Sequence, residues 1–191
     1  MAASFRKENS TTPIIVMGYA NPIHHMGYAE FAQKAKTAGI DGAIIVDLPP
    51  EEDGDLRAAF ESHDLALIRL ATPTTDDARL PVVVSGTKGF VYYVSVAGIT
   101  GKDLGASAAV SSAVVRIREA SGLPVVVGFG IKTPEQARSV AQDADAAVVG
   151  SAIVDAIAQT LDENGAATET TVSAPLALVK TLSDAAHEPR S

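Results

Sequence analysis

The sequence predicts an α/β fold with a parallel sheet, built as a (β/α)8 TIM barrel that lacks about its first two strand-helix units. Short apolar, β-branched runs alternate with helical segments about six times along the 191 residues, which is typical of a parallel sheet. The last two runs each lead through glycine into a helix, as at the phosphate site after strands 7 and 8 of such barrels. We expect one domain over residues 1–191. An open doubly wound sheet is the rival, favoured by the strand count alone.

The first glycine junction follows a strand expected at residues 125–127. Gly128 and Gly130 come next, and Thr133 and Gln136 then form a capping box with a proline at the first helical position. Glycines before a helix N-terminus let an anion approach backbone N–H groups, and the helix dipole favours negative charge there. The sequence therefore indicates a phosphate site, with a plain turn of small residues as the alternative.

The second junction repeats this arrangement after a strand expected at residues 146–149. Gly150 and Ser151 lead from it into a helix that reaches residue 157. Two consecutive junctions of this kind are more specific than either alone. We therefore expect backbone amides from the loops at Gly128 and Gly150 to converge on a single phosphate.

The rest of the chain is expected to alternate in the same way. Further strands are expected at residues 13–19, 42–49, 65–70 and 89–95, and helices at residues 28–38, from about 54 to 63, 76–84, 108–120 and 174–186. Residues 1–12 indicate the last turn of a helix and a loop, 20–27 a loop, 96–105 an active-site lid or a surface loop, and 162–171 a disordered segment. Asp47 ends its strand, where barrels carry chemistry, so it is either functional or the cap of the following helix.

The composition of the chain argues against several classes of ligand and binding partner. A net charge of −8 and a pI near 4.9 argue against nucleic acid and anionic membranes. The chain has no cysteine, which excludes disulfides and thiolate metal sites, and no apolar run reaches membrane-spanning length. His24 and His25 are adjacent, so their imidazoles do not share a face, and we expect no metal site. With no signal peptide in residues 1–8, we expect a cytoplasmic protein.

Five segments occur in the order and spacing of one enzyme family. They lie at residues 17–22, 46–49, 92–101, 128–131 and 150–154, and over about residues 5–187 the chain resembles the α subunit of tryptophan synthase. The resemblance implies a lyase of tryptophan biosynthesis that cleaves indole-3-glycerol phosphate into indole and glyceraldehyde 3-phosphate. It also implies an α2β2 assembly in which indole passes to the β subunit. Pyridoxal phosphate is then expected in that partner, with no cofactor in this chain.

The resemblance assigns roles to individual residues. It implies a phosphate and substrate site of Tyr92, Thr100, Gly101, Gly128, Phe129, Gly130, Gly150 and Ser151. Within this set Phe129 resembles a wall of the indole pocket, Thr100 the lid residue and Tyr92 the tyrosine beside the indole-glycerol group. A second set is similar to the family's surface for the β subunit and for signalling to it: Tyr19, Asn21, Asp47 and Pro49.

The reaction itself needs two further groups. Retro-aldol cleavage requires an acid that protonates indole C3 and a carboxylate that accepts protons as the bond breaks. In the family these carboxylates follow strands 1 and 2, so the resemblance implies no catalytic residue within this chain. The alternative function is therefore a non-catalytic remnant that binds phosphate or docks on the β subunit. Another phosphate-binding barrel, such as an indole-glycerol-phosphate synthase or a sugar-phosphate isomerase, is a more distant possibility.

Overall fold

The computed structural model describes residues 1–95, 104–128 and 130–188, with the backbone alone at 104–107. These residues form two compact units, one of residues 1–91 and 120–123 and the other of residues 92–119 and 124–191. Most of the expected lid lies outside the described residues, as do the predicted site residues Thr100, Gly101 and Phe129. The single domain over residues 1–191 stays a prediction.

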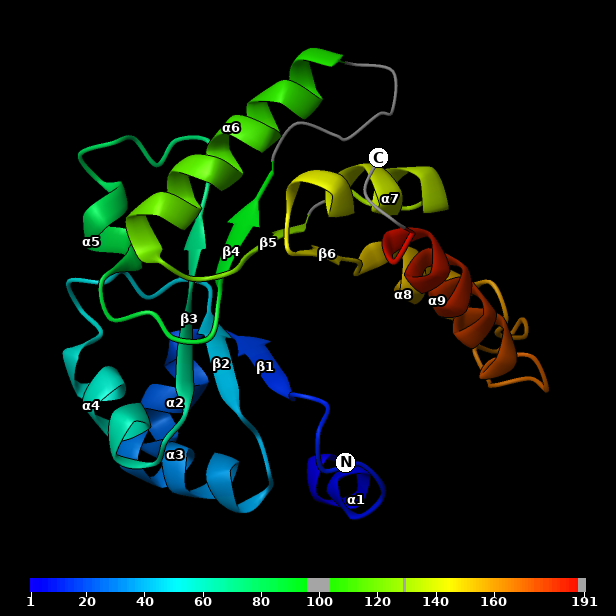
Figure 1. Cartoon of the computed structure of the whole chain (residues 1–191). Helices are drawn as coiled ribbons and strands as arrows, with labels where there is room; N and C mark the ends of the chain where they lie inside the picture. The colour runs from blue at the N-terminus through cyan, green and yellow to red at the C-terminus, as the bar shows by residue number, and fades with distance from the viewer. Residues whose placement is uncertain (96–103, 129, 189–191) are drawn as a thin grey trace. The chain divides into compact units, whose positions relative to one another are not determined.

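The first unit contains three parallel strands, with β2 (Gly42–Ile45) between β1 (Ile15–Gly18) and β3 (Ala66–Ala71). The helices that alternate with these strands in Figure 1 are α1 (Ala2–Glu8), α2 (Ala20–Met26), α3 (Tyr28–Thr37), α4 (Gly54–Ser62) and α5 (Leu80–Val84). Apolar faces of α3 and α4 form a core with the strands. In it the rings of Phe31 and Phe60 stack with their centroids 6.0 Å apart. This packing fixes the strand ends from which the loops of the unit depart.

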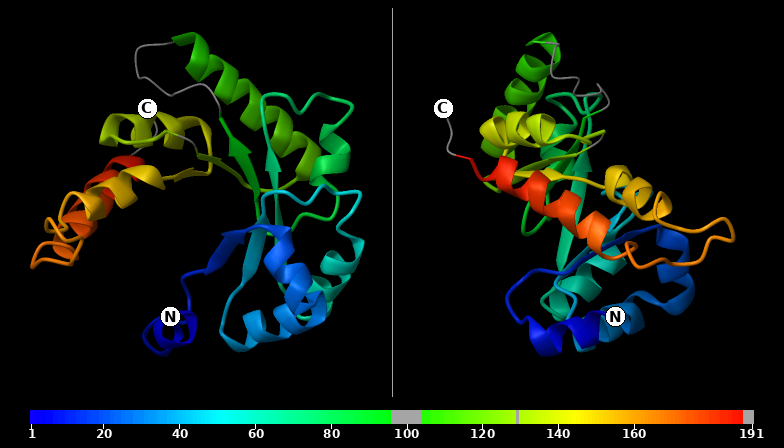
Figure 2. Two further views of the ribbon diagram at one scale, coloured as in Figure 1. Left: turned by 180° about the vertical axis from the view of Figure 1, so that it is seen from behind. Right: turned by 90° about the vertical axis from the view of Figure 1, so that its right-hand side faces the viewer.

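The second unit begins within β4 (Val91–Val94) and contains the parallel pair β5 (Val125–Gly128) and β6 (Ala146–Val148). Its helices are α6 (Leu104–Ser121), α7 (Pro134–Asp143), α8 (Ser151–Ala158) and α9 (Ser173–Ala186), and α9 lies beside α7 and α8 in Figures 1 and 2. Burial alternates along β4, where Tyr93 is buried and Tyr92 is partly exposed, as a strand predicts. The side chains of β5 are buried on both faces, as expected for a parallel sheet.

Strand order follows the chain within each unit, β1-β2-β3 in the first and β4-β5-β6 in the second. A doubly wound sheet would reverse its order at a switch point. Parallel strands in chain order, each followed by helix, are instead the arrangement of a (β/α)8 barrel, here with six strands among the described residues in place of eight. The prediction of an incomplete barrel is confirmed.

Each unit has an Asp–Arg ion pair at the N-terminal ends of its strands. Asp41 precedes β2, and its carboxylate accepts a hydrogen bond at 2.7 Å from the N–H just before β1 while it pairs with Arg6. Asp145 precedes β6, accepts at 2.8 Å from the first N–H of β5 and pairs with Arg118. Because the N-terminal end of barrel strands serves stability, these two pairs hold the sheet register at the end away from the predicted chemistry.

Several element boundaries differ from the prediction. Residues 20–27 are mostly helix α2 and not a loop, and α6 begins at Leu104, before the expected residue 108. The helix expected at residues 76–84 is only α5, because the Asp76 carboxylate accepts a hydrogen bond at 2.7 Å from Arg79 N and closes a turn before it. Segment 162–171 was expected to be disordered, but the Asp162 side chain accepts hydrogen bonds from two backbone N–H groups at 2.9 and 2.8 Å and orders a turn.

Candidate functional site

The junction between β5 and α7 satisfies its own helix terminus. Thr133 Oγ1 accepts a hydrogen bond from Gln136 N at 3.3 Å, and Gln136 Oε1 accepts from Thr133 N at 3.2 Å and from Lys132 N at 2.8 Å. The capping box predicted from the sequence is therefore confirmed, with Pro134 in the first turn. Because protein oxygens already bind these N–H groups, this helix end has little capacity left for an anion.

The junction between β6 and α8 is built differently. Gly150 is the N-cap of α8 and has no side chain with which to accept a hydrogen bond from the first turn. Ser151 is the first helical residue and is exposed, and the first turn contains no acidic residue. The first N–H groups of a helix lack intrahelical partners, and the helix dipole gives that end a partial positive charge. This terminus can therefore bind an anion.

The strand register brings the ends of these two junctions together. Gly128 at the end of β5 pairs with Val148 at the end of β6. Gly130 and Gly150 each lie two residues beyond this pair, and both are exposed. Gly130 also has a φ of +78°, a conformation that favours glycine. Glycine loops from two neighbouring strands therefore depart from the same end of the sheet.

Gly128 has a steric reason to be glycine. A Cβ at this position would overlap Tyr92 Oη and lie 2.7 Å from Tyr92 Cε2. The tyrosine ring thus lies against the backbone at the end of β5, and burial raises the pKa of its hydroxyl. The structure brings these two predicted site residues into contact. Tyr92 occupies the space beside the Gly128 Cα. A contact between Gly128 and phosphate stays a prediction.

In the first unit, Asp47 joins two of the predicted partner-facing segments. Its Oδ1 accepts a hydrogen bond at 2.7 Å from Ala20 N, the first N–H of α2. Tyr19, the N-cap of α2, is 65% exposed, and Asn21 is exposed as well. Asp47 therefore does cap a helix, but the helix is α2 and not the following α4 that the sequence suggested. Pro49 is exposed two residues further along the same loop.

Sequence reasoning missed how the acidic residues after this loop are used. Glu51 pairs with Arg79 through two oxygens, one of them 2.9 Å from Nη2. This hydrogen bond lowers the pKa of Glu51 to about 2. Asp53 is 1% exposed and pairs with Arg69, which is itself 6% exposed in β3. Burial raises the pKa of Asp53 and lowers that of Arg69. The one sequence feature that could have indicated this pair is Arg69, a charged residue inside the otherwise apolar strand β3.

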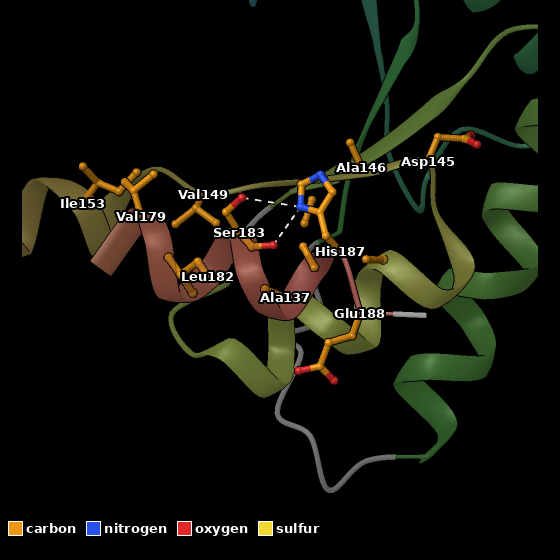
Figure 3. Close-up of a pocket in the computed structure, with 13 residues that line it drawn as sticks. Ala137, Asp145, Ala146, Val149, Ile153, Val179, Leu182, Ser183, His187 and Glu188 are labelled. Carbon is orange, nitrogen blue, oxygen red and sulfur yellow. Dashed lines mark hydrogen bonds between the residues drawn. The ribbon is translucent and has the colours of Figure 1, made fainter. Parts of the chain in front are cut away.

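Two other features of the described structure were possible sites, and neither of them includes the predicted phosphate residues. His24 Nδ1 lies 3.3 Å from Tyr28 Oη, and no cluster of three potential metal ligands occurs among the residues with described positions. A pocket of about 440 Å3 lies among β6, α7, α8 and α9, lined by Leu182 and His187 among others (Figure 3). None of the predicted site residues lines it, and the His187 ring is bound at 2.7 Å to the Ser183 carbonyl oxygen of its own helix. No helix in the described ranges is long and apolar enough to cross a bilayer.

Comparison with known proteins identifies relatives over nearly the whole chain. The family model for the tryptophan synthase alpha chain matches residues 1–187. The alpha chain of Caulobacter sp. (strain K31) is 60% identical over 166 residues, which are 86% of this chain and 60% of that relative. The alpha chain of Phenylobacterium zucineum (strain HLK1) is 55% identical over 182 residues, 95% of this chain and 66% of that relative. The chain thus spans less than two thirds of the length of these relatives.

Solved structures give the same result. The tryptophan synthase alpha chain of Legionella pneumophila subsp. pneumophila has a TM-score of 0.82 at 38% identity, covering 97% of this chain and 66% of that one. A chain of the tryptophan synthase α2β2 complex from Pyrococcus furiosus has a TM-score of 0.78 at 31% identity, covering 96% of this chain and 70% of that one. The family resemblance noted in the five sequence segments is therefore confirmed.

Proposed function

The chain belongs to the tryptophan synthase alpha chain family, and on that premise we propose that it acts in tryptophan biosynthesis as the α subunit, a lyase for indole-3-glycerol phosphate. In this reaction the bond between indole C3 and the glycerol chain breaks, C3 takes up a proton, and the adjacent hydroxyl loses its proton to become an aldehyde. The products are indole and glyceraldehyde 3-phosphate. Indole is then consumed by a β subunit, which holds the pyridoxal phosphate.

One observation carries the assignment of the substrate. The N-terminus of α8 has no side-chain cap and no acidic residue in its first turn, and it follows the strand whose end pairs with the end of β5, two residues before Gly130. A phosphate dianion there would accept hydrogen bonds from the first two amides of the helix, at Ser151 and Ala152, which precede the two amides bound by the Gly150 carbonyl. We assign Tyr92, whose ring lies against Gly128, to the border of the organic part of the same substrate. The rest of the site, including Thr100, Gly101 and Phe129, is assigned by resemblance alone.

We propose a β subunit as the partner protein from a different set of residues. Tyr19, Asn21 and Pro49 are exposed, and Asp47 links the start of α2, which carries the first two, to the loop of Pro49. Exposed residues held in fixed positions by a hydrogen bond suit a protein interface, because little ordering is left to occur on binding. The comparison with an α2β2 complex supports a β subunit as the protein that docks here.

Indole release from indole-3-glycerol phosphate tests the proposal, measured with and without β subunit. Release with both proteins present would support the lyase assignment. Ser151→Asp should lower the rate by about fivefold to tenfold, because its carboxylate repels the phosphate at the α8 terminus. Ser173→Asp is the matched control, since it adds the same charge at the first residue of α9. Absence of release in every mixture would refute the lyase assignment.

A second candidate function is a module that binds phosphate or the β subunit without catalysis. Among the described residues within two positions after the six strands, Asp47 alone is acidic, whereas the cleavage needs both an acid and a base. Titrating the chain with glycerol 3-phosphate and with β subunit tests this function. Binding of either, with no indole release, would favour it over the lyase, and failure to bind both would end it.

A further inference from the structure

The buried pair of Asp53 and Arg69 has few other polar partners in the described structure. Asp53 precedes α4, where it makes no side-chain cap, and its carboxylate turns to Arg69 of β3 instead. Apart from this pair, neither oxygen of Asp53 nor Nε of Arg69 has a hydrogen-bond partner in the described structure. The nearest further charge is Arg57, whose Nε lies 3.9 Å from Asp53 Oδ1.

Such a pair is a weak source of folding stability. The loss of hydration when two charges are buried offsets their attraction, and a hydrophobic pair of similar volume is often as stable or more stable. Hydrogen bonds that could compensate are also missing here. The pair therefore suits a role in fixing a position better than a role in stabilising the fold.

The pair of Asp53 and Arg69 fixes the position of residues 46–53, the segment between β2 and α4. Three carboxylates of this segment each bind a different element: Asp47 binds α2, Glu51 binds Arg79 before α5, and Asp53 binds β3. The anchors lie around one pocket of about 360 Å3, whose lining includes Asp47, Pro49, Arg69 and Arg79. Asp53 is the only buried carboxylate of the three, so its anchor is the least accessible to competing water.

We propose that Asp53 and Arg69 are positioning residues that hold the loop of Asp47 and Pro49 in the conformation that docks a partner protein. This inference rests on the proposed function, in which the partner is the β subunit. Asp47 and Pro49 contact that partner, and Asp53 and Arg69 act through them. Losing the pair leaves the loop with its two more exposed anchors, at Ala20 and Arg79.

The decisive variant removes both charges together. Asp53→Leu/Arg69→Met should fold with a thermal midpoint near that of wild type, because neither charge is left unpaired. It should bind β subunit at least tenfold more weakly and show faster hydrogen exchange at the Leu48 amide. Its affinity for glycerol 3-phosphate, whose proposed site is in the other unit, should not change. The single variants are expected to lose stability and are not informative about docking by themselves.

A matched control removes another ion pair by the same exchange. Arg138→Met/Glu188→Leu breaks a pair of 2.5 Å between side chains that are 42% and 49% exposed, and it should bind β subunit as wild type does. If the Asp53/Arg69 double variant also binds β subunit with wild-type affinity, the positioning role is refuted. If the wild-type chain itself does not bind, the proposed partner is refuted and this inference with it.

Discussion

Two neighbouring strands of the second unit lead into helices through glycine, and the two junctions differ in one respect. After β5, Thr133 and Gln136 supply the oxygens that the α7 terminus needs. After β6, Gly150 has no side-chain oxygen to offer α8, although its carbonyl accepts hydrogen bonds from Ile153 N at 3.0 Å and Val154 N at 3.3 Å, and Ser151 is exposed. Both helices begin at the same end of paired parallel strands. The comparison teaches that two glycine junctions of similar sequence can differ in whether a side chain caps the helix that follows.

The glycines of the two junctions also differ in their surroundings. Gly128 is buried against Tyr92, whereas a Cβ at Gly150 would meet no atom within 4 Å. The first junction is therefore packed from within, and the second is open to solvent. The following predictions test this contrast.

The largest effect is expected for Gly128→Ala. Its methyl group overlaps Tyr92, so the free energy of unfolding should fall by about 1–3 kcal/mol. Gly150→Ala is the matched change at the open junction and should alter stability by less than about 0.5 kcal/mol. Urea denaturation of both variants measures the two changes in the free energy of unfolding. Equal losses would contradict the contrast, and Tyr92→Ala should recover part of the loss in the Gly128→Ala background.

Thr133→Ala removes the cap of α7 and should cost about 1 kcal/mol of stability. Binding of glycerol 3-phosphate should be unchanged, because the proposed donors belong to the uncapped α8. Denaturation and calorimetric titration of the same preparation separate the two quantities. A loss of phosphate affinity larger than threefold would show that the α7 terminus takes part in binding.

A smaller effect is expected from acid. Glu135 lies in the first turn of α7, where hydrogen bonds to backbone and to Thr133 lower its pKa below the usual 4.5. A lowered pKa means that the ionised form stabilises the folded chain above about pH 4.5, and that this contribution is lost as pH falls through the lowered value. Glu135→Gln should flatten the stability curve of wild type in that acid range. Parallel curves for both proteins would contradict this.

The sequence predicted the parts of the molecule that depend on near neighbours. The capping box of Thr133 and Gln136 spans four residues, and the alternation of Tyr92 and Tyr93 follows from strand geometry, so both could be deduced from the order of the residues alone. The boundaries that failed depend on distant groups. Helix α2 was missed because its first N–H is bound by Asp47, from the end of another strand.

The candidate site divides in the same way. Glycines followed by a helix identified Gly130 and Gly150 locally, and family resemblance added Tyr92 and Ser151. The pairing of Asp53 with Arg69 could not be predicted, because it depends on how the segment before α4 meets β3 after folding. Arg69 could only be recognised as a charge that interrupts an apolar strand.

The most direct test is to observe the amides themselves. Titration of the 15N-labelled chain with glycerol 3-phosphate should move the amide resonances of Ser151 and Ala152 along saturable curves, while that of Gln136, which is already bound by Thr133, stays in place. The account would be contradicted if the Ser151 and Ala152 resonances did not move, or if the Gln136 resonance moved with the same midpoint.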